Sequence, residues 1–128
     1  MDPSNAENLP IFIRIANGVK DHILMGNVEE GGKLPSTPQL AKTYEINIAT
    51  VNRAYNILVD EGIVFKKRGI GMFVAEGAVE KLIAERRAAF KENYIAAALR
   101  EARLLRYSVE DLQQIVAEVF EQQNPQNE

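Results

Sequence analysis

The chain has 128 residues, of which 46% are hydrophobic and 26% are charged, and its formal net charge is -3 at pH 7. This length and composition indicate one globular domain, or a small domain with an appendage, and not an intrinsically disordered chain. With no cysteine and a single histidine, His22, the chain cannot form disulfides, thiolate metal sites or a multi-histidine metal site of its own.

Several other classes of protein are also disfavoured. No apolar run approaches the ~20 residues that span a bilayer, and the N-terminal residues lack the basic and apolar regions of a signal peptide. We therefore expect a cytoplasmic protein that does not act on membranes. The sequence contains no phosphate-binding loop, no pair of catalytic carboxylates and no nucleophile with its base. It predicts a protein that is not an enzyme and binds no cofactor or metal.

The first expected helix runs from Pro10 to about Gly26. Proline fits a first-turn position and glycine a helix stop. The apolar residues follow one another in steps of three and four, as on one face of a helix: Phe12, Ile15, Ala16, Val19 and Ile23. By the same spacing we expect Met25, Met72, Phe12, Phe65 and Phe73 to pack in the core. Residues 27–33 are expected to form a loop.

Two further helices are predicted by their caps. Ser36 is followed three residues later by Gln39, which is the pattern of a capping box, so a second helix should run to Thr43 or Tyr44. Asn47 is the next candidate cap. A third helix is expected from residue 48 to about residue 61, and Gly62 ends it.

A short hairpin should follow the third helix. Residues 63–65 and 72–74 have the composition of strands, and Gly69 and Gly71 permit a tight turn between them. The order helix, helix, turn, helix, hairpin is that of a winged helix-turn-helix, and we assign this domain to residues 9–76. The fold class is therefore mainly α with a small β-hairpin.

The pattern changes after Gly77. Helical spacing continues from Val79 to Leu105, and Ser108 is a candidate cap for a last short helix. Two helices cannot enclose a core alone, so they need either the first domain or another chain. We assign residues 77–122 to a two-helix dimerisation segment that could also bind an effector. The apolar residues proposed for dimerisation are Leu82, Ile83, Phe90, Tyr94, Leu112, Ile115, Val119 and Phe120.

A helix-turn-helix places the N-terminal residues of its third helix against base edges in the major groove. Here the outward residues Asn47, Thr50, Asn52 and Arg53 are polar, and the basic run 66–68 at the hairpin would lie on phosphates or in the minor groove. Each feature also has an ordinary explanation, because asparagine caps helices without DNA and short basic runs are usually solvated. Winged helices also serve as protein-interaction modules, which leaves that alternative open.

Several strings resemble the GntR family of bacterial transcription regulators, over residues 10–75. They are Pro10-Ile11-Phe12 with Ile15-Ala16; Gly32-Lys33-Leu34-Pro35-Ser36 with Gln39-Leu40-Ala41; Ile46-Asn47, Thr50-Val51, Arg53-Ala54-Tyr55 and Leu58; Glu61-Gly62-Ile63-Val64; and residues 68–74. The resemblance implies DNA contacts at Ser36, Thr50, Arg53 and the two hairpin glycines. The full candidate set for DNA is Ser36, Thr37, Gln39, Asn47, Ala49, Thr50, Asn52, Arg53, Lys66, Lys67, Arg68, Gly69 and Gly71.

The chain departs from the family pattern at two positions. Pro38 stands where members usually carry an arginine that would read guanine, and Asn52 stands where many have arginine. The short tail is similar to the YtrA-like branch, in which a helical tail forms a homodimer. The resemblance implies a homodimeric, sequence-specific regulator of transcription, expected to be a repressor, on a palindromic operator of double-stranded DNA. Nothing in the sequence identifies a small-molecule effector.

Overall fold

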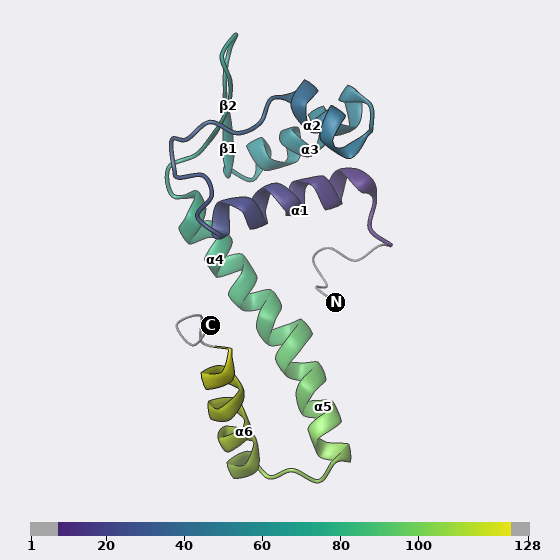
Figure 1. The fold of residues 1–128 in the computed structure, drawn as a ribbon, viewed down its shortest axis with the longest axis vertical. Helices are drawn as coiled ribbons and strands as arrows, with labels where there is room; N and C mark the ends of the chain where they lie inside the picture. The colour runs from purple at the N-terminus through teal and green to yellow at the C-terminus, as the bar shows by residue number, and fades with distance from the viewer. Residues whose placement is uncertain (1–7, 124–128) are drawn as a thin grey trace. The chain divides into compact units, whose positions relative to one another are not determined.

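The computed structural model describes residues 8–123, and the chain divides into two compact units between Arg87 and Ala88. Figure 1 shows the elements in chain order. They are α1 (Ile11–Leu24), α2 (Thr37–Tyr44), α3 (Ile48–Asp60), β1 (Val64–Lys67), β2 (Gly71–Val74), α4 (Ala78–Ala89), the π-helix η2 (Phe90–Ile95), α5 (Ala96–Leu104) and α6 (Val109–Gln122). The expected fold class, mainly α with a small β-hairpin, is confirmed.

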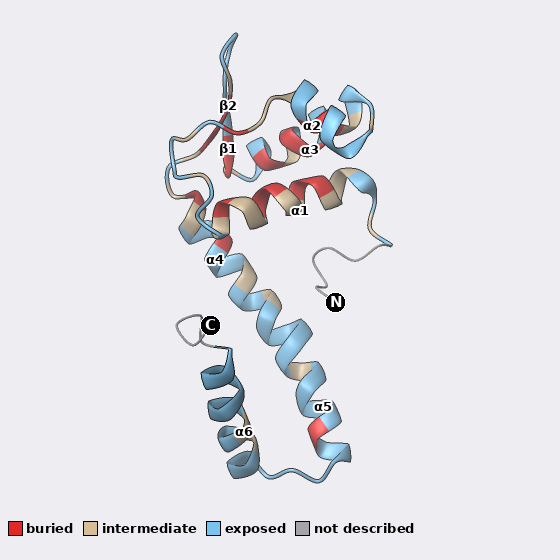
Figure 2. Ribbon diagram, viewed as in Figure 1, coloured by how far each residue is buried: buried red, intermediate tan, exposed pale blue. Residues whose placement is uncertain are grey.

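Helix α1 begins and ends where its flanking residues predicted. Pro10 precedes its first turn, and Gly26 follows it with a φ of 81°, a left-handed conformation that glycine adopts without a Cβ penalty. The face that repeats every three to four residues is buried (Figure 2). Met25 was wrongly expected in the core: it lies one residue beyond α1 and is 70% exposed.

The predicted caps of α2 and α3 are both present. Ser36 Oγ accepts a hydrogen bond from the Gln39 amide at 3.1 Å, and Gln39 Oε1 accepts one from the Ser36 amide at 2.7 Å. This reciprocal pair satisfies two amides at the start of α2. Glu45 ends α2 in a left-handed conformation, and the Asn47 side chain then caps α3. The two helices are therefore separated by a tight turn of three residues, 45–47.

The hairpin, called the wing below (residues 64–74), pairs Val64 with Val74 and Lys67 with Gly71 in an antiparallel register. The loop before α2 extends this sheet, because the Leu34 amide donates to the Met72 carbonyl at 2.8 Å. Val64 of β1 and residues 72–74 of β2 are buried, and the tip of the wing is exposed. Phe65 lies on the exposed side, 36% exposed, and stacks on Phe73 instead of entering the core.

The core of the first unit is formed by α1, α2, α3, both strands and the beginning of α4. Ala78 and Leu82 of α4 are fully buried in it. Leu82 was expected at a dimer interface, yet its side chain packs in this core because α4 starts immediately after the wing. The first unit therefore extends into α4, past the boundary at residues 76 and 77 expected from the change in sequence pattern.

The second unit contains η2, α5 and α6. One uninterrupted helix was expected from Val79 to Leu105; the structure instead has a π-helical segment in which the Ala96 amide donates to the Lys91 carbonyl, five residues back. Ser108 and Asp111 form a capping box at the start of α6, as the sequence indicated. Among residues 88–123, Ala102 alone is buried.

Candidate nucleic-acid interface

Two hydrogen bonds position the start of α2 against α3. Thr37 Oγ1 in the first turn of α2 donates to Asn52 Oδ1 of α3 at 3.2 Å. The buried hydroxyl of Tyr55, also on α3, donates to the Pro35 carbonyl, and burial raises the pKa of this hydroxyl above its usual value. The tyrosine therefore stays a neutral donor, and the two bonds hold the residues around Ser36 next to the exposed face of α3.

Asn47 is committed to capping through its side-chain oxygen. Its Oδ1 accepts two hydrogen bonds, one from the Thr50 amide and one from Thr50 Oγ1, both at 2.9 Å. Since a carbonyl oxygen has two lone pairs, both are engaged, and the group that Asn47 can offer to DNA is its NH₂. The hydroxyl proton of Thr50 is directed to Asn47, so a Thr50 donor contact to DNA requires that bond to break.

The other amide side chains of this surface are similarly oriented. Gln39 is exposed and uses Oε1 in the capping box, while Asn52 is exposed and accepts from Thr37. Ala49 in the first turn of α3 and Pro38 in the first turn of α2 are also exposed. The surface therefore presents N–H donors, which suit phosphate oxygens and the purine acceptors of the major groove.

Arg53 is the only basic residue of α3, and its guanidinium lies 3.8 Å from the ring centre of Phe12 on α1. This is a cation–π contact, which holds the charge against α1. The position of Arg53 in the chain predicted an exposed side chain, and the side chain is exposed. The contact with Phe12 could not be predicted from the local sequence, because the two residues come from different helices.

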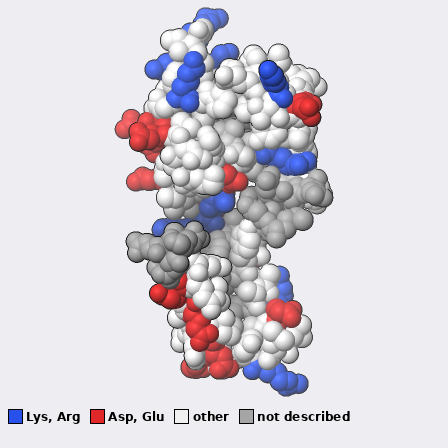
Figure 3. Space-filling view, in the orientation of Figure 1, with Lys and Arg blue, Asp and Glu red and all other residues white. Residues whose placement is uncertain are grey.

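Most of the positive charge on the candidate DNA-binding surface lies on the wing. Lys66, Lys67 and Arg68 are exposed at its tip, and Figure 3 shows basic side chains along it. Lys67 Nζ lies 4.6 Å from the ring centre of Phe73, over the aromatic pair of the wing. Gly69 turns the chain with a φ of 76°. The predicted basic residues are therefore brought together on one hairpin.

Lys33 joins this basic surface and was missed as a site residue in the sequence. It bridges to Phe73 of β2, and a Cβ placed on Gly71 would lie 3.0 Å from Lys33 Cε. Gly71 also has a φ of 148°, so a larger residue would be strained as well as crowded. Lys33 is in the loop before α2, and no local pattern linked that loop to the wing.

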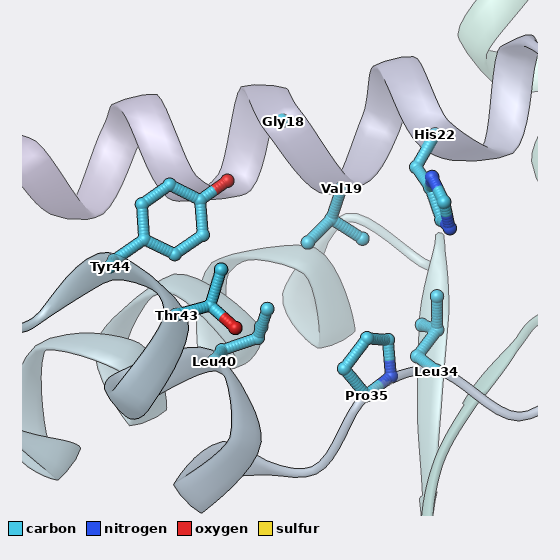
Figure 4. Close-up of a pocket in the computed structure, with 8 residues that line it drawn as sticks. All are labelled: Gly18, Val19, His22, Leu34, Pro35, Leu40, Thr43 and Tyr44. Atoms are coloured by element: carbon cyan, nitrogen blue, oxygen red, sulfur yellow. The ribbon is translucent and has the colours of Figure 1, made fainter.

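A small apolar pocket lies between α1 and α2. Its volume is about 230 Å³, and Figure 4 shows side chains from both helices and from the preceding loop around it. The lining residues are Gly18, Val19, His22, Leu34, Pro35, Leu40, Thr43 and Tyr44. This volume is below the range of about 300–1,000 Å³ that is usual for small-molecule sites. Among residues 8–123 no cluster of His, Cys, Asp or Glu could hold a metal ion.

The apolar residues assigned to dimerisation differ in exposure. Leu82 belongs to the core described above, whereas Leu112 and Ile115 of α6 are half-buried. The others leave more than a third of their surface in solvent: Ile83, Phe90, Tyr94, Val119 and Phe120. None of the helices within residues 8–123 is long and apolar enough to cross a membrane.

The sequence pattern of the family described as "Bacterial regulatory proteins, gntR family" matches residues 13–74. The HTH-type transcriptional repressor YtrA of Bacillus subtilis is 35% identical over 92 residues, 72% of this chain and 69% of that protein. A GntR-family regulator from Bacteroides thetaiotaomicron is 32% identical, with a TM-score of 0.71 over 90% of this chain and 100% of that one.

A more distant structure has the same fold. It is the AraR DNA-binding domain in complex with operator ORR3, with 24% identity and a TM-score of 0.52 over 59% of this chain and 92% of that one. These relatives are regulators of transcription and not enzymes, as expected for this chain. The chain belongs to the GntR family of bacterial transcription regulators and carries the family's DNA-binding winged-helix domain.

Proposed function

We propose that this protein is a homodimeric repressor that binds a palindromic operator, with α3 in the major groove and the wing on the phosphate backbone. The observation that carries the proposal is the joint exposure of the amide-rich start of α3 and the basic wing on one unit. The proposed sign of regulation follows YtrA of Bacillus subtilis, which is named a repressor. Because the proposed partner is DNA, we place the protein in the cytoplasm.

In the proposed complex the contacts divide into two kinds. Lys66, Lys67 and Arg68, with Lys33 beside them, would neutralise phosphates and supply most of the salt-dependent affinity. The amide donors of Gln39, Asn47 and Asn52 would meet acceptors on phosphates or base edges. Asn47 cannot read adenine with both of its polar atoms, because that pairing also needs the oxygen that caps α3.

A homodimer is supported by the apolar surface of the second unit. Val119 and Phe120 of α6 and Phe90 and Tyr94 of η2 are exposed, and burial of each large side chain would contribute roughly 1.5–3 kcal/mol. A second copy of the chain is the simplest cover, since two-fold contacts are the commonest among soluble oligomers. Two-fold symmetry in the protein then predicts two-fold symmetry in the operator.

A second candidate function is a winged-helix protein-interaction module that does not bind specific DNA. Two residues favour this alternative. Arg53, the one cation of α3, is held against the ring of Phe12. Pro38 stands at the position where members of the family usually carry an arginine, so α2 lacks that cation as well. The net charge of -3 also opposes binding to a polyanion through overall charge alone.

Selection of bound DNA from a random double-stranded pool separates the two functions. The full-length protein should enrich a palindrome, and light scattering of the complex should give two chains per duplex. A variant with Lys66, Lys67 and Arg68 all changed to Gln serves as the control, and it should bind all DNA more weakly. If the unaltered protein enriches no sequence at a salt concentration near 0.1 M, the proposed function is wrong and the interaction module is favoured.

A further inference from the structure

The first turns of α4 are anchored to the winged-helix domain at both polar and apolar contacts. Glu30 accepts hydrogen bonds from the Gly77 amide at 2.9 Å and the Val79 amide at 3.1 Å, which satisfies donors at the start of the helix. These bonds lower the pKa of Glu30, so the carboxylate is charged at neutral pH. One turn further on, Leu82 is fully buried in the core.

A buried lysine connects three helices at this point. Lys20 of α1 is only 8% exposed, and its Nζ lies 2.8 Å from Glu61 Oε1 at the end of α3 and 3.1 Å from Glu85 Oε1 of α4. Burial alone would lower the pKa of Lys20, but the hydrogen bonds and the charge attraction of Glu61 and Glu85 together outweigh burial and raise the pKa. The ammonium therefore stays charged and links α1, α3 and α4.

A second ion pair lies directly beside the first. Asp21 follows Lys20 on α1 and pairs with Arg86, which follows Glu85 on α4. We call these four residues, Lys20, Asp21, Glu85 and Arg86, the α4 clamp. The burial of Leu82 is non-directional, whereas two neighbouring ion pairs of opposite polarity restrict how α4 can rotate and tilt on α1.

Glu85 is the second carboxylate at Lys20, and it is the one that belongs to α4. Glu61 already places a carboxylate 2.8 Å from the ammonium, and α4 is already held in the core by Ala78 and Leu82 and at its start by Glu30. A carboxylate at residue 85 is therefore best explained by orientation of α4. A tilt of about 10° at one end moves the other end of this 12-residue helix by about 3 Å, which is close to one base-pair step.

We infer that the α4 clamp sets the distance between the two operator half-sites that the dimer accepts, with Glu85 as a positioning residue that does not touch DNA. This inference rests on the proposed function, since it requires a homodimer on a palindromic operator. One added base pair both lengthens the operator and rotates the second half-site by about 35°, so a fixed α4 direction should favour one spacing.

The test uses the full-length protein on a series of operators whose half-sites are separated by zero to eight base pairs. The unaltered protein should bind its best spacing about tenfold more tightly than spacings two base pairs away. The change Glu85→Lys places a cation opposite Lys20 and should reduce this preference to about twofold, and Glu85→Gln should give an intermediate value. Glu80→Lys makes the same change of charge on an exposed position of α4 and should keep the tenfold preference.

Binding to DNA with a single half-site, measured by fluorescence anisotropy, separates orientation from general damage. Both Glu85 variants should stay within about twofold of the unaltered protein there, because the DNA surface is unchanged. Circular dichroism checks the fold, and Glu85→Gln keeps the experiment decisive if Glu85→Lys unfolds.

The possible outcomes separate this inference from the proposed function. Absence of binding to any operator would overturn the proposed function. Binding with no preferred spacing, or a preference that both Glu85 variants share unchanged, would overturn the inference while leaving the operator-binding function intact.

Discussion

The two compact units contain similar local signals but bury very different amounts of apolar surface. Both begin helices with a capping box, at Ser36 in the first unit and at Ser108 in the second. In the first unit the apolar faces of six elements share one core, whereas among residues 88–123 only Ala102 is buried. In both units, therefore, helix caps determine where helices start. Only the first unit has enough helices and strands to bury the apolar faces of its helices.

This comparison shows that an amphipathic pattern identifies the apolar face of a helix but does not identify the element or chain that buries this face. Leu82 and Phe90 follow the same helical spacing along α4 and η2. Leu82 is fully buried by the first unit, and Phe90 is 54% exposed. The cover of an apolar residue is set by tertiary packing, and in the second unit we propose that a second chain supplies it.

The largest effect should come from the shared core. Leu82→Ala should lower the free energy of unfolding by about 2–5 kcal/mol, because it removes a fully buried side chain from the packed first unit. Leu104→Ala in the second unit removes a side chain that is 77% exposed and should change stability by at most about 0.5 kcal/mol. Urea unfolding measures both. Equal losses would show that the boundary between the units does not separate buried from exposed surface.

The next effect concerns the exposed face of α6. Phe120→Asp should weaken the proposed dimer by roughly 1.5–3 kcal/mol for each copy, while the helical content of each chain is retained. Gln113→Asp introduces the same charge on α6 at an exposed polar position and should leave the dimer intact. Light scattering across a dilution series gives the association constants. A monomeric unaltered protein at micromolar concentration would rule out the dimer and, with it, the palindromic operator.

The first turn of α2 should respond to a new basic side chain. Pro38→Arg should strengthen or redirect DNA binding, with a gain of about 1–3 kcal/mol at sites that offer guanine, since arginine donates two hydrogen bonds to that base. Glu110→Arg makes a comparable change at the same helical position of α6 and should not alter site preference. DNA selection with both variants provides the readout. If Pro38→Arg selects the same sites with the same affinity, Pro38 does not face the bases.

The cap of α3 allows folding and recognition to be separated. Asn47→Ala should lower stability by about 1 kcal/mol through loss of the cap. Asn47→Asp retains an oxygen for the Thr50 amide but removes the NH₂ donors, so it should keep stability and weaken DNA binding. Asn56→Asp adds the same charge at an exposed position near the other end of α3 and serves as the control. Equal binding by the two Asp variants would assign Asn47 a purely structural role.

The smallest effect should come from single lysines of the basic surface. Lys66→Gln and Lys33→Gln should each lower the salt slope of DNA binding by about one unit, as expected for the loss of one phosphate contact. Lys91→Gln, an exposed lysine of the second unit, should leave the slope unchanged. Binding measured from 50 to 200 mM salt tests all three variants. A slope unaltered by Lys33→Gln would remove that lysine from the proposed interface.

The parts of the fold that depend on neighbouring residues could be predicted from sequence. Ser36 with Gln39, Asn47 before α3 and Gly62 after it each satisfy backbone groups or permit a turn within a few positions. The order of the elements then predicted the winged helix, and the spacing of Gly69 and Gly71 predicted the hairpin.

The features that could not be predicted join residues far apart in the chain. Lys20 is buried because carboxylates from α3 and α4 surround it, and Arg53 is held because α1 brings Phe12 below it. Lys33 reaches the wing because its loop pairs with β2. In each of these pairs the two residues are separated by far more than one helical turn of sequence. No periodicity or short motif in the sequence could therefore predict the contact between them.

The π-helical segment also bears on how the length of this chain can change. Its hydrogen bonds span five residues where those of an α-helix span four, so the segment holds about one residue more than an α-helical stretch with the same number of bonds. Deletion of one residue between Phe90 and Ile95 would allow regular α-helical bonding from α4 into α5. Residues of α5 would then keep about their present orientation around the helix axis, because the π segment has already absorbed the extra residue, whereas the same deletion in a regular α-helix turns every later residue by about 100°. Among the helices of the described chain, η2 is therefore where the loss of a single residue should disturb both the backbone hydrogen bonds and the direction of the later side chains least.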